Sequence, residues 1–195
     1  MGELTTSELT TLEYSLDELR RAIVGLVAAE MDVVSNCAPW TVRRLAAHAL
    51  DNQLFWAGLV TGSEIVSHHD AMAAIAYEGD LAAHAVDVTA RALAIWQTDG
   101  VLEQTLATPL GELPGSVVVD FPTIDALAHA WDITASVGRP VDFAPDRIPA
   151  ITTVVQATCS DAARAKGLIQ PVTSAPSDAT GTERLMTLAG RAIPR

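Results

Sequence analysis

Several features that mark secreted and membrane proteins are missing from this sequence. It has only two cysteines, Cys37 and Cys159, and no CxxC motif, so no disulfide framework is predicted. The first residues contain no basic segment followed by an apolar one, which is the pattern of a signal peptide. No stretch reaches the roughly 18 uninterrupted apolar residues that indicate a membrane span. We therefore expect a cytoplasmic protein that does not enter a membrane.

Positive charge is also scarce. The chain has 12 lysines and arginines against 24 acidic residues, for a formal net charge of −12. Such an excess of negative charge repels phosphate backbones and anionic lipid, so neither nucleic acid nor an acidic membrane surface is an expected partner. The simplest role of the acidic surface is to keep the protein in solution.

Aromatic and β-branched residues are too few or too scattered to build a large sheet. Alanine and leucine dominate the apolar residues, and both favour helices. A chain of 195 residues can bury one sizeable core. We expect an all-α fold in one domain over 1–195, with a core bundle over about 7–139 and a helical C-terminal extension over about 146–191.

Apolar residues recur at spacings of three and four in several segments, which predicts helices. Thr41 is the expected N-cap of the second helix, and Gly62 its expected end. The predicted helices cover about 7–30, 41–61, 80–98, 122–137, 146–166 and 182–191.

Two segments between these helices lack the helical pattern. The segment 63–78 is ambiguous and contains His68 and His69, which we interpret as exposed loop histidines. The segment 99–121 is punctuated by proline and glycine, with Val117 to Val119 expected to be extended and a short hairpin a second possibility. A connection this long in a compact domain is often functional.

One pair of polar residues suggests a metal site. Asp125 and His129 are four residues apart on a predicted helix, so their side chains leave the same face one turn apart and can bind one divalent ion. His48, on the apolar stripe of the second helix, supplies a third ligand if the two helices pack together. Three protein ligands leave a fourth position open, as in catalytic zinc sites. Spacing alone also allows His48 to be a packing residue and the pair to be a surface hydrogen bond.

Two stretches around these residues resemble a known family. The segment 36–48 (NCAPWTVRRLAAH) resembles the PCxxWxVxxLxxH signature of actinobacterial DinB-like proteins, and the segment 125–132 (DALAHAWD) resembles their (D/E)xxxHxWD helix. The segments 110–115 and 184–191 resemble the family's glycine- and proline-containing connection and its terminus. Over nearly its whole length the chain is similar to the N-terminal domain of mycothiol-dependent maleylpyruvate isomerases and to their single-domain relatives.

The resemblance implies a fold and a ligand set. The fold would be a DinB-like four-helix bundle with extra C-terminal helices and a long connection before helix four. The metal ligands would be His48, Asp125 and His129, with zinc the first expectation and nickel also suited to these donors. Mycothiol would be a co-substrate, and a homodimer would be a common assembly.

The sequence departs from the isomerase in two ways. The isomerase has glutamate where this chain has Asp125, which is one methylene shorter. It also has a second, C-terminal domain that contributes to its active site, for which this sequence leaves no room. We therefore do not expect maleylpyruvate isomerisation itself.

Three further residues lie close to the predicted ligands in sequence. Asp132, three residues after His129, could hold one imidazole nitrogen and fix its tautomer, or could be a surface carboxylate. Asn52, one turn from His48, could line the pocket. Cys37, just before the second helix, could be reactive, but a small buried packing residue is the favoured interpretation.

Three functional hypotheses follow. The first is a metal-dependent thiol S-transferase or isomerase that acts on a small electrophilic molecule with a low-molecular-weight thiol such as mycothiol. The second is a metal-dependent hydrolase on the same scaffold, in which water takes the open position. The third is a non-catalytic module in which the metal is structural or the chain binds a partner.

Overall fold

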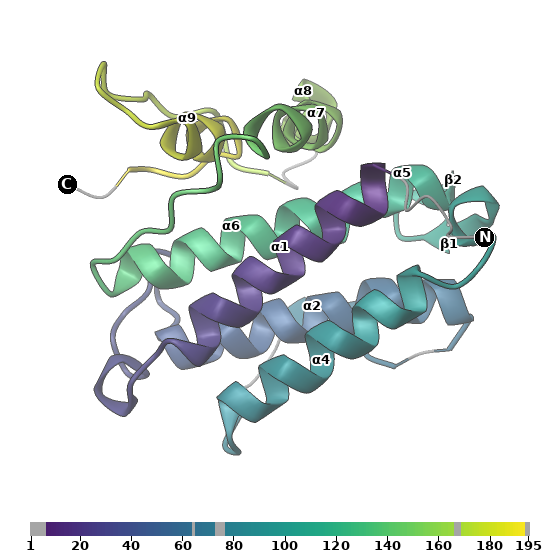
Figure 1. The fold of residues 1–195 in the computed structure, drawn as a ribbon, viewed down its shortest axis with the longest axis horizontal. Coiled ribbons are helices and arrows are strands. Elements are labelled where there is room, and N and C mark those ends of the chain that lie inside the picture. Colours follow the sequence, from purple (N-terminus) through teal and green to yellow (C-terminus); the bar gives the residue numbers. More distant parts are fainter. Residues whose placement is uncertain (1–6, 64, 73–76, 166–168, 194–195) are drawn as a thin grey trace.

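The computed structural model describes residues 7–63, 65–72, 77–165 and 169–193 and is mostly helical. Four long helices lie alongside one another and form a bundle: α1 (Ser7–Val24), α2 (Val42–Thr61), α4 (Leu81–Trp96) and α6 (Asp120–Ser136) (Figure 1). The predicted all-α four-helix bundle is thereby confirmed. None of the helices in the described part of the chain is long and apolar enough to cross a membrane.

The first helix is shorter than predicted. It ends at Val24 rather than near residue 30, and a short 3-10 helix, η1 (Ala28–Glu30), follows. The Glu30 carboxylate accepts a hydrogen bond from the backbone N–H of Val27 at 3.0 Å, so this side chain caps a new turn instead of continuing α1.

The second helix begins and ends where the sequence predicts. The Thr41 hydroxyl accepts a hydrogen bond from the backbone N–H of Arg44, which satisfies a donor that the helix itself leaves open. Gly62 ends the helix in the left-handed conformation with φ of 64°, which glycine adopts without a steric penalty.

The connection before α6 contains the short hairpin, and its valines are helical. Strands β1 (Thr105–Thr108) and β2 (Gly111–Pro114) pair antiparallel after a 3-10 turn, η2 (Val101–Glu103). The predicted extended run at Val117 to Val119 is wrong, because Gly115–Val118 form a short helix, α5, that leads into α6. Val118 and Val119 are fully buried there, and this burial outweighs their β preference.

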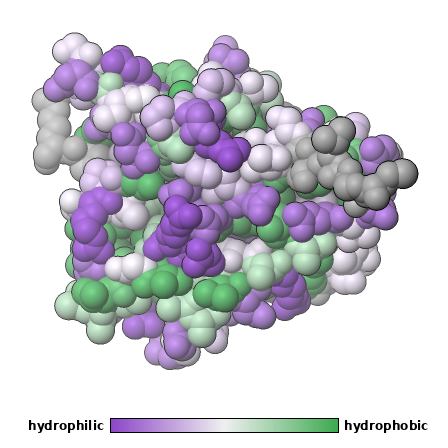
Figure 2. Space-filling view, in the orientation of Figure 1, coloured by the Kyte–Doolittle hydropathy of each residue, from purple (hydrophilic) through white to green (hydrophobic). Residues whose placement is uncertain are grey.

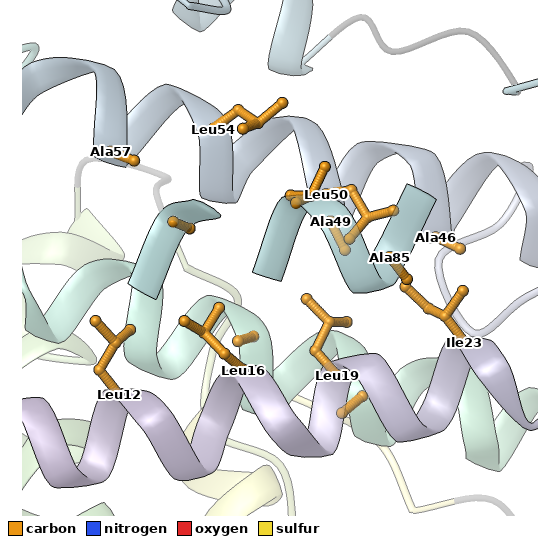
Figure 3. Close-up of a cluster of buried hydrophobic side chains, with 14 of the residues drawn as sticks. Leu12, Leu16, Leu19, Ile23, Ala46, Ala49, Leu50, Leu54, Ala57 and Ala85 are labelled. Atoms are coloured by element: carbon orange, nitrogen blue, oxygen red, sulfur yellow. The ribbon is translucent and has the colours of Figure 1, made fainter. Parts of the chain in front are cut away.

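The bundle core consists of aliphatic side chains. In Figure 3 the leucines of α1, such as Leu12, Leu16 and Leu19, point toward small and aliphatic residues of α2 and α4. Alanines such as Ala49 and Ala85 let the helices approach closely, and both are fully buried. On the face shown in Figure 2, hydrophilic and hydrophobic residues are interspersed.

The C-terminal extension packs on the other side of α6. Helices α7 (Ile148–Thr158), α8 (Asp161–Ala165) and α9 (Gly181–Leu188) lie beyond α6 in Figure 1. A second apolar cluster joins α6, α7 and α9 around Trp131, Phe143 and Met186. The predicted helix over 146–166 is interrupted after Thr158, its predicted end near Gly167 lies outside the described residues, and the last helix ends at Leu188 rather than at residue 191.

Candidate metal centre

Helix α6 presents three polar side chains at the centre of the molecule. His129 lies between two carboxylates: its Nε2 is 3.4 Å from Oδ1 of Asp125, and its Nδ1 is 3.4 Å from Oδ2 of Asp132. The spacings of four and three residues place both carboxylates on the same face as the imidazole. Both His129 and Asp132 are buried, so the charges interact in a poorly solvated environment.

Helix α2 brings His48 to the same place. Its ring centroid is 5.2 Å from that of His129. Nδ1 of His48 contacts the backbone carbonyl of Ala71, in the short helix α3 (His68–Met72), and Nε2 lies 3.2 Å from Nδ2 of Asn52. Because a carbonyl can only accept, Nδ1 carries the proton and Nε2 carries the lone pair. A neutral imidazole with a fixed tautomer is the form that binds a metal.

Two amide side chains of α2 fix the orientation of Asp125. Nδ2 of Asn52 donates to Oδ1 at 3.0 Å, and Nε2 of Gln53 donates to Oδ2 at 3.1 Å. Asn52 therefore contacts both His48 and Asp125, as expected for a pocket residue. Gln53 is a residue that sequence reasoning missed. Its position next to Asn52 on a bundle helix does not by itself indicate the contact, and only the structure shows that the side chain is buried.

The pKa values in this cluster indicate a site that holds positive charge. Burial opposes protonation of His129, but the Asp125 carboxylate and then Asp132 outweigh it and raise the pKa of His129 well above its usual value. Burial and the neighbouring charge of His129 lower the pKa of His48. The pKa of Asp125 is lowered although burial raises it, because His129 and His48 lie nearby. The carboxylate is therefore ionised and the His48 imidazole is neutral.

Asp132 links the centre to the C-terminal segment. Its Oδ2 accepts hydrogen bonds from Nε and Nη2 of Arg191 at 3.2 and 3.1 Å, and the thiol of Cys37 donates to the same oxygen at 3.5 Å. Cys37 is half-buried rather than fully buried, but it packs against the bundle core, as the favoured interpretation expects. The sequence indicates Arg191 only as part of the terminal motif, because 59 residues separate it from Asp132.

An open pocket adjoins these residues. Its volume is about 870 Å³, and both predicted histidine ligands, His48 and His129, lie on its wall together with Cys37 and Asp132. Trp40 lies against His48 on the same wall, with ring centroids 4.7 Å apart. A pocket of this size accommodates a small molecule next to the imidazoles.

Two of the three predicted ligands, His129 and Asp125, are spaced as a divalent ion requires. Two imidazoles and one carboxylate suit zinc or nickel, and the 3.4 Å between His129 Nε2 and Asp125 Oδ1 is close to the roughly 3.3 Å between two ligands on tetrahedral zinc. His48 lies further from Asp125 than His129 does, because the side-chain amide of Asn52 lies between Nε2 of His48 and Oδ1 of Asp125. Among the described residues, the group whose ligand atoms all lie within 4.8 Å of one another is Cys37, His129 and Asp132.

The remaining histidines do not join the centre. His68 and His69 belong to the exposed helix α3 rather than to a loop, and the ring of His68 contacts Phe55. His84 stacks on Tyr77 with ring centroids 4.2 Å apart.

Comparison with known proteins adds three findings. No family model matches the chain. Two uncharacterized proteins of Mycobacterium tuberculosis, one from strain CDC 1551 and one from strain H37Rv, are each 28% identical over 138 residues, which is 67% of this chain and 67% of theirs. Among solved structures, the mycothiol-dependent maleylpyruvate isomerase superposes with a TM-score of 0.65 and 18% identity, over 86% of this chain and 77% of that one.

A second crystal structure of that isomerase, a histidine-to-alanine mutant, superposes with a TM-score of 0.66, again with 18% identity over the same shares of the two chains. At this identity the likeness establishes the arrangement of the helices. The chain therefore has the DinB-like helical fold of the mycothiol-dependent maleylpyruvate isomerase, as the sequence motifs predicted.

Proposed function

We propose that the protein is a divalent-metal-dependent enzyme of the thiol S-transferase or isomerase type, with His48, Asp125 and His129 as the metal ligands. The observation that carries the proposal is the position of the two imidazoles, whose centroids are 5.2 Å apart on the wall of one open pocket. The structural neighbour is a mycothiol-dependent isomerase, which supports a low-molecular-weight thiol as co-substrate.

Each residue of the site has a separate task in this proposal. Asp125 contributes a carboxylate that Asn52 and Gln53 hold in place, and His48 contributes a neutral nitrogen because Ala71 accepts its other proton. Zinc or nickel bound there would favour the thiolate form of a coordinated thiol near neutral pH. The thiol would lose its proton to solvent, and its sulfur would add to an electron-poor double-bonded carbon of the second substrate. The π electrons of that bond would move to the far atom, which takes up a proton from solvent, and the pocket would hold the two reactants together.

The pocket favours a catalytic role over a structural one. A structural metal is usually enclosed by four protein ligands, whereas His48 and His129 border a cavity of about 870 Å³. A small electrophilic molecule is the substrate class that matches this volume and the proposed thiol. Zinc is the metal we expect first, on the basis of the two imidazoles and one carboxylate.

The test is a conjugation assay. Zinc-loaded protein with mycothiol should accelerate the consumption of a small test electrophile, and His48→Ala should remove the acceleration. His69→Ala, a change at an exposed histidine of α3, is the matched control and should keep it. No rate above background for the unchanged protein would contradict the proposal, and turnover of an ester or amide without thiol would favour a hydrolase instead.

A further inference from the structure

On the side of the His129 ring that faces away from Asp125, the side chains of Asp132 and Cys37 form a second cluster with Nδ1. Nδ1 of His129 is fully buried and has no hydrogen-bond partner, although Oδ2 of Asp132 lies 3.4 Å away. The thiol sulfur of Cys37 lies 3.5 Å from the same carboxylate oxygen. This nitrogen therefore faces the carboxylate as an ion-pair partner without a formed hydrogen bond, and nitrogen, oxygen and sulfur atoms grouped in this way are donors that bind a divalent ion.

The distances in this cluster match a tetrahedral metal site. Zinc bonds of about 2.3 Å to sulfur and about 2.0 Å to nitrogen and oxygen place sulfur and oxygen about 3.5 Å apart and nitrogen and oxygen about 3.3 Å apart. The corresponding distances here are 3.5 Å from Cys37 Sγ to Asp132 Oδ2 and 3.4 Å from His129 Nδ1 to the same oxygen. All three ligand atoms lie within 4.8 Å of one another, so only small side-chain movements would close the site.

We propose that Cys37, His129 and Asp132 form a second cation site, separate from the one proposed above, that binds a thiophilic ion such as zinc or cadmium. The ion would use Nδ1 of His129, whereas the proposed function uses Nε2 of the same ring. On binding, the Cys37 S–H bond and the His129 Nδ1–H bond break, sulfur–metal and nitrogen–metal bonds form, and both protons pass to solvent. The pocket at Cys37 offers an entry path and an open fourth position.

Arg191 determines how much further negative charge this site needs in order to bind a cation. Its guanidinium donates twice to Oδ2 of Asp132 and so neutralises that carboxylate. A cation therefore gains little from Asp132 alone and needs the thiolate of Cys37 as a second negative group. This requirement makes the site selective for ions that prefer sulfur over those that prefer oxygen.

Cobalt titration of the full chain tests the inference, because a thiolate bound to Co²⁺ gives a charge-transfer band in the near ultraviolet. The band should appear with the unchanged protein under a phosphine reductant. It should also appear with Asp125→Asn, which removes a ligand of the other site. Cys37→Ser should lose the band, while Cys159→Ser, the control for the remaining thiol, should keep it.

Two results would overturn the inference. One is the absence of a thiolate band in the unchanged protein at saturating cobalt. The other is a band that persists in Cys37→Ser, since the sulfur ligand would then be elsewhere. Circular dichroism of each variant checks that the fold is kept, and Cys37→Ala serves as a second variant if Cys37→Ser does not fold. The band depends on neither mycothiol nor His48, so this result is independent of the conjugation assay.

Discussion

Arg191 and Asp132 form an ion pair that ties the C-terminal segment to helix α6, with Nη2 and Nε donating to Oδ2 at 3.1 and 3.2 Å. The Asp132 side chain is 1% exposed. Burial raises its pKa, but Arg191 and His129 outweigh this and lower the pKa of Asp132 below its usual value. The segment after α9 is thus coupled to the candidate metal centre through one carboxylate.

Arg191→Met should destabilise the fold. Removing the guanidinium leaves a buried carboxylate with less compensation, a change that costs about 3 kcal/mol at comparable sites. Urea denaturation measures the loss in the free energy of unfolding. In the double variant with Asp132→Asn much of this loss should disappear, because the unpaired charge is gone. A loss in Arg191→Met no greater than in Arg184→Met, whose guanidinium is exposed, would contradict the coupling.

Gln53→Leu should weaken metal binding without removing a ligand. Leucine keeps most of the side-chain volume but cannot donate to Oδ2 of Asp125, so the carboxylate loses one of the two amide donors that orient it. Loss of such an outer contact typically lowers metal affinity about 10- to 100-fold. Calorimetric zinc titration measures the change, and Gln156→Leu on the exposed face of α7 is the control. Equal affinity in the two variants would mean that Gln53 does not position the ligand.

Asp120→Asn should stabilise the protein above about pH 6 and leave it unchanged below about pH 4. Burial, followed by the charge of Glu8, raises the pKa of Asp120 to about 6 from a model-compound value of 3.8. The folded state therefore binds more protons than the unfolded state between these values, and stability falls as pH rises through that range.

The amide removes this penalty, with an expected gain of about 1 kcal/mol after allowing for solvent screening of a half-buried group. Thermal denaturation across the pH range measures it, and Asp99→Asn, the same replacement at an exposed position, is the matched control. A gain for Asp120→Asn that is independent of pH would rule out titration as its cause.

Gly190→Ala should be more harmful than Gly62→Ala. Both glycines have positive φ, 81° and 64°, which costs about 1 kcal/mol for alanine. A Cβ at Gly190 would also lie 2.7 Å from the backbone oxygen of Gln170, whereas at Gly62 nothing lies within 4 Å. The extra clash adjoins Arg191, so Gly190→Ala should lower the melting temperature further. Equal melting temperatures for the two variants would show that the Gln170 segment moves away freely.

The sequence predicts the bundle well because each long helix carries an apolar stripe of its own. Leu12, Leu16 and Leu19 repeat at helical spacing and are buried in the core. Thr41 and Gly62 mark the ends of α2 by local hydrogen bonding and backbone conformation. The valines before α6 were misjudged because burial between elements distant in sequence decides their conformation.

In the candidate site too, contacts within one helix follow from the sequence, whereas contacts between distant segments do not. Asp125 and His129 share one helix, so their proximity follows from their spacing. Contacts of Gln53 with Asp125 and of Arg191 with Asp132 join segments 72 and 59 residues apart, and no local pattern specifies them. The Ala71 carbonyl that fixes the His48 tautomer lies in a short helix that the sequence left ambiguous.

X-ray absorption spectroscopy with a single equivalent of zinc tests the central claim most directly, and the Cys37→Ser variant is used throughout so that the proposed sulfur-containing site cannot take the ion. The account predicts a first shell of nitrogen and oxygen with two imidazoles, and the loss of one imidazole in His48→Ala. A shell unchanged by His48→Ala, or no zinc bound by the protein that retains His48, would contradict it.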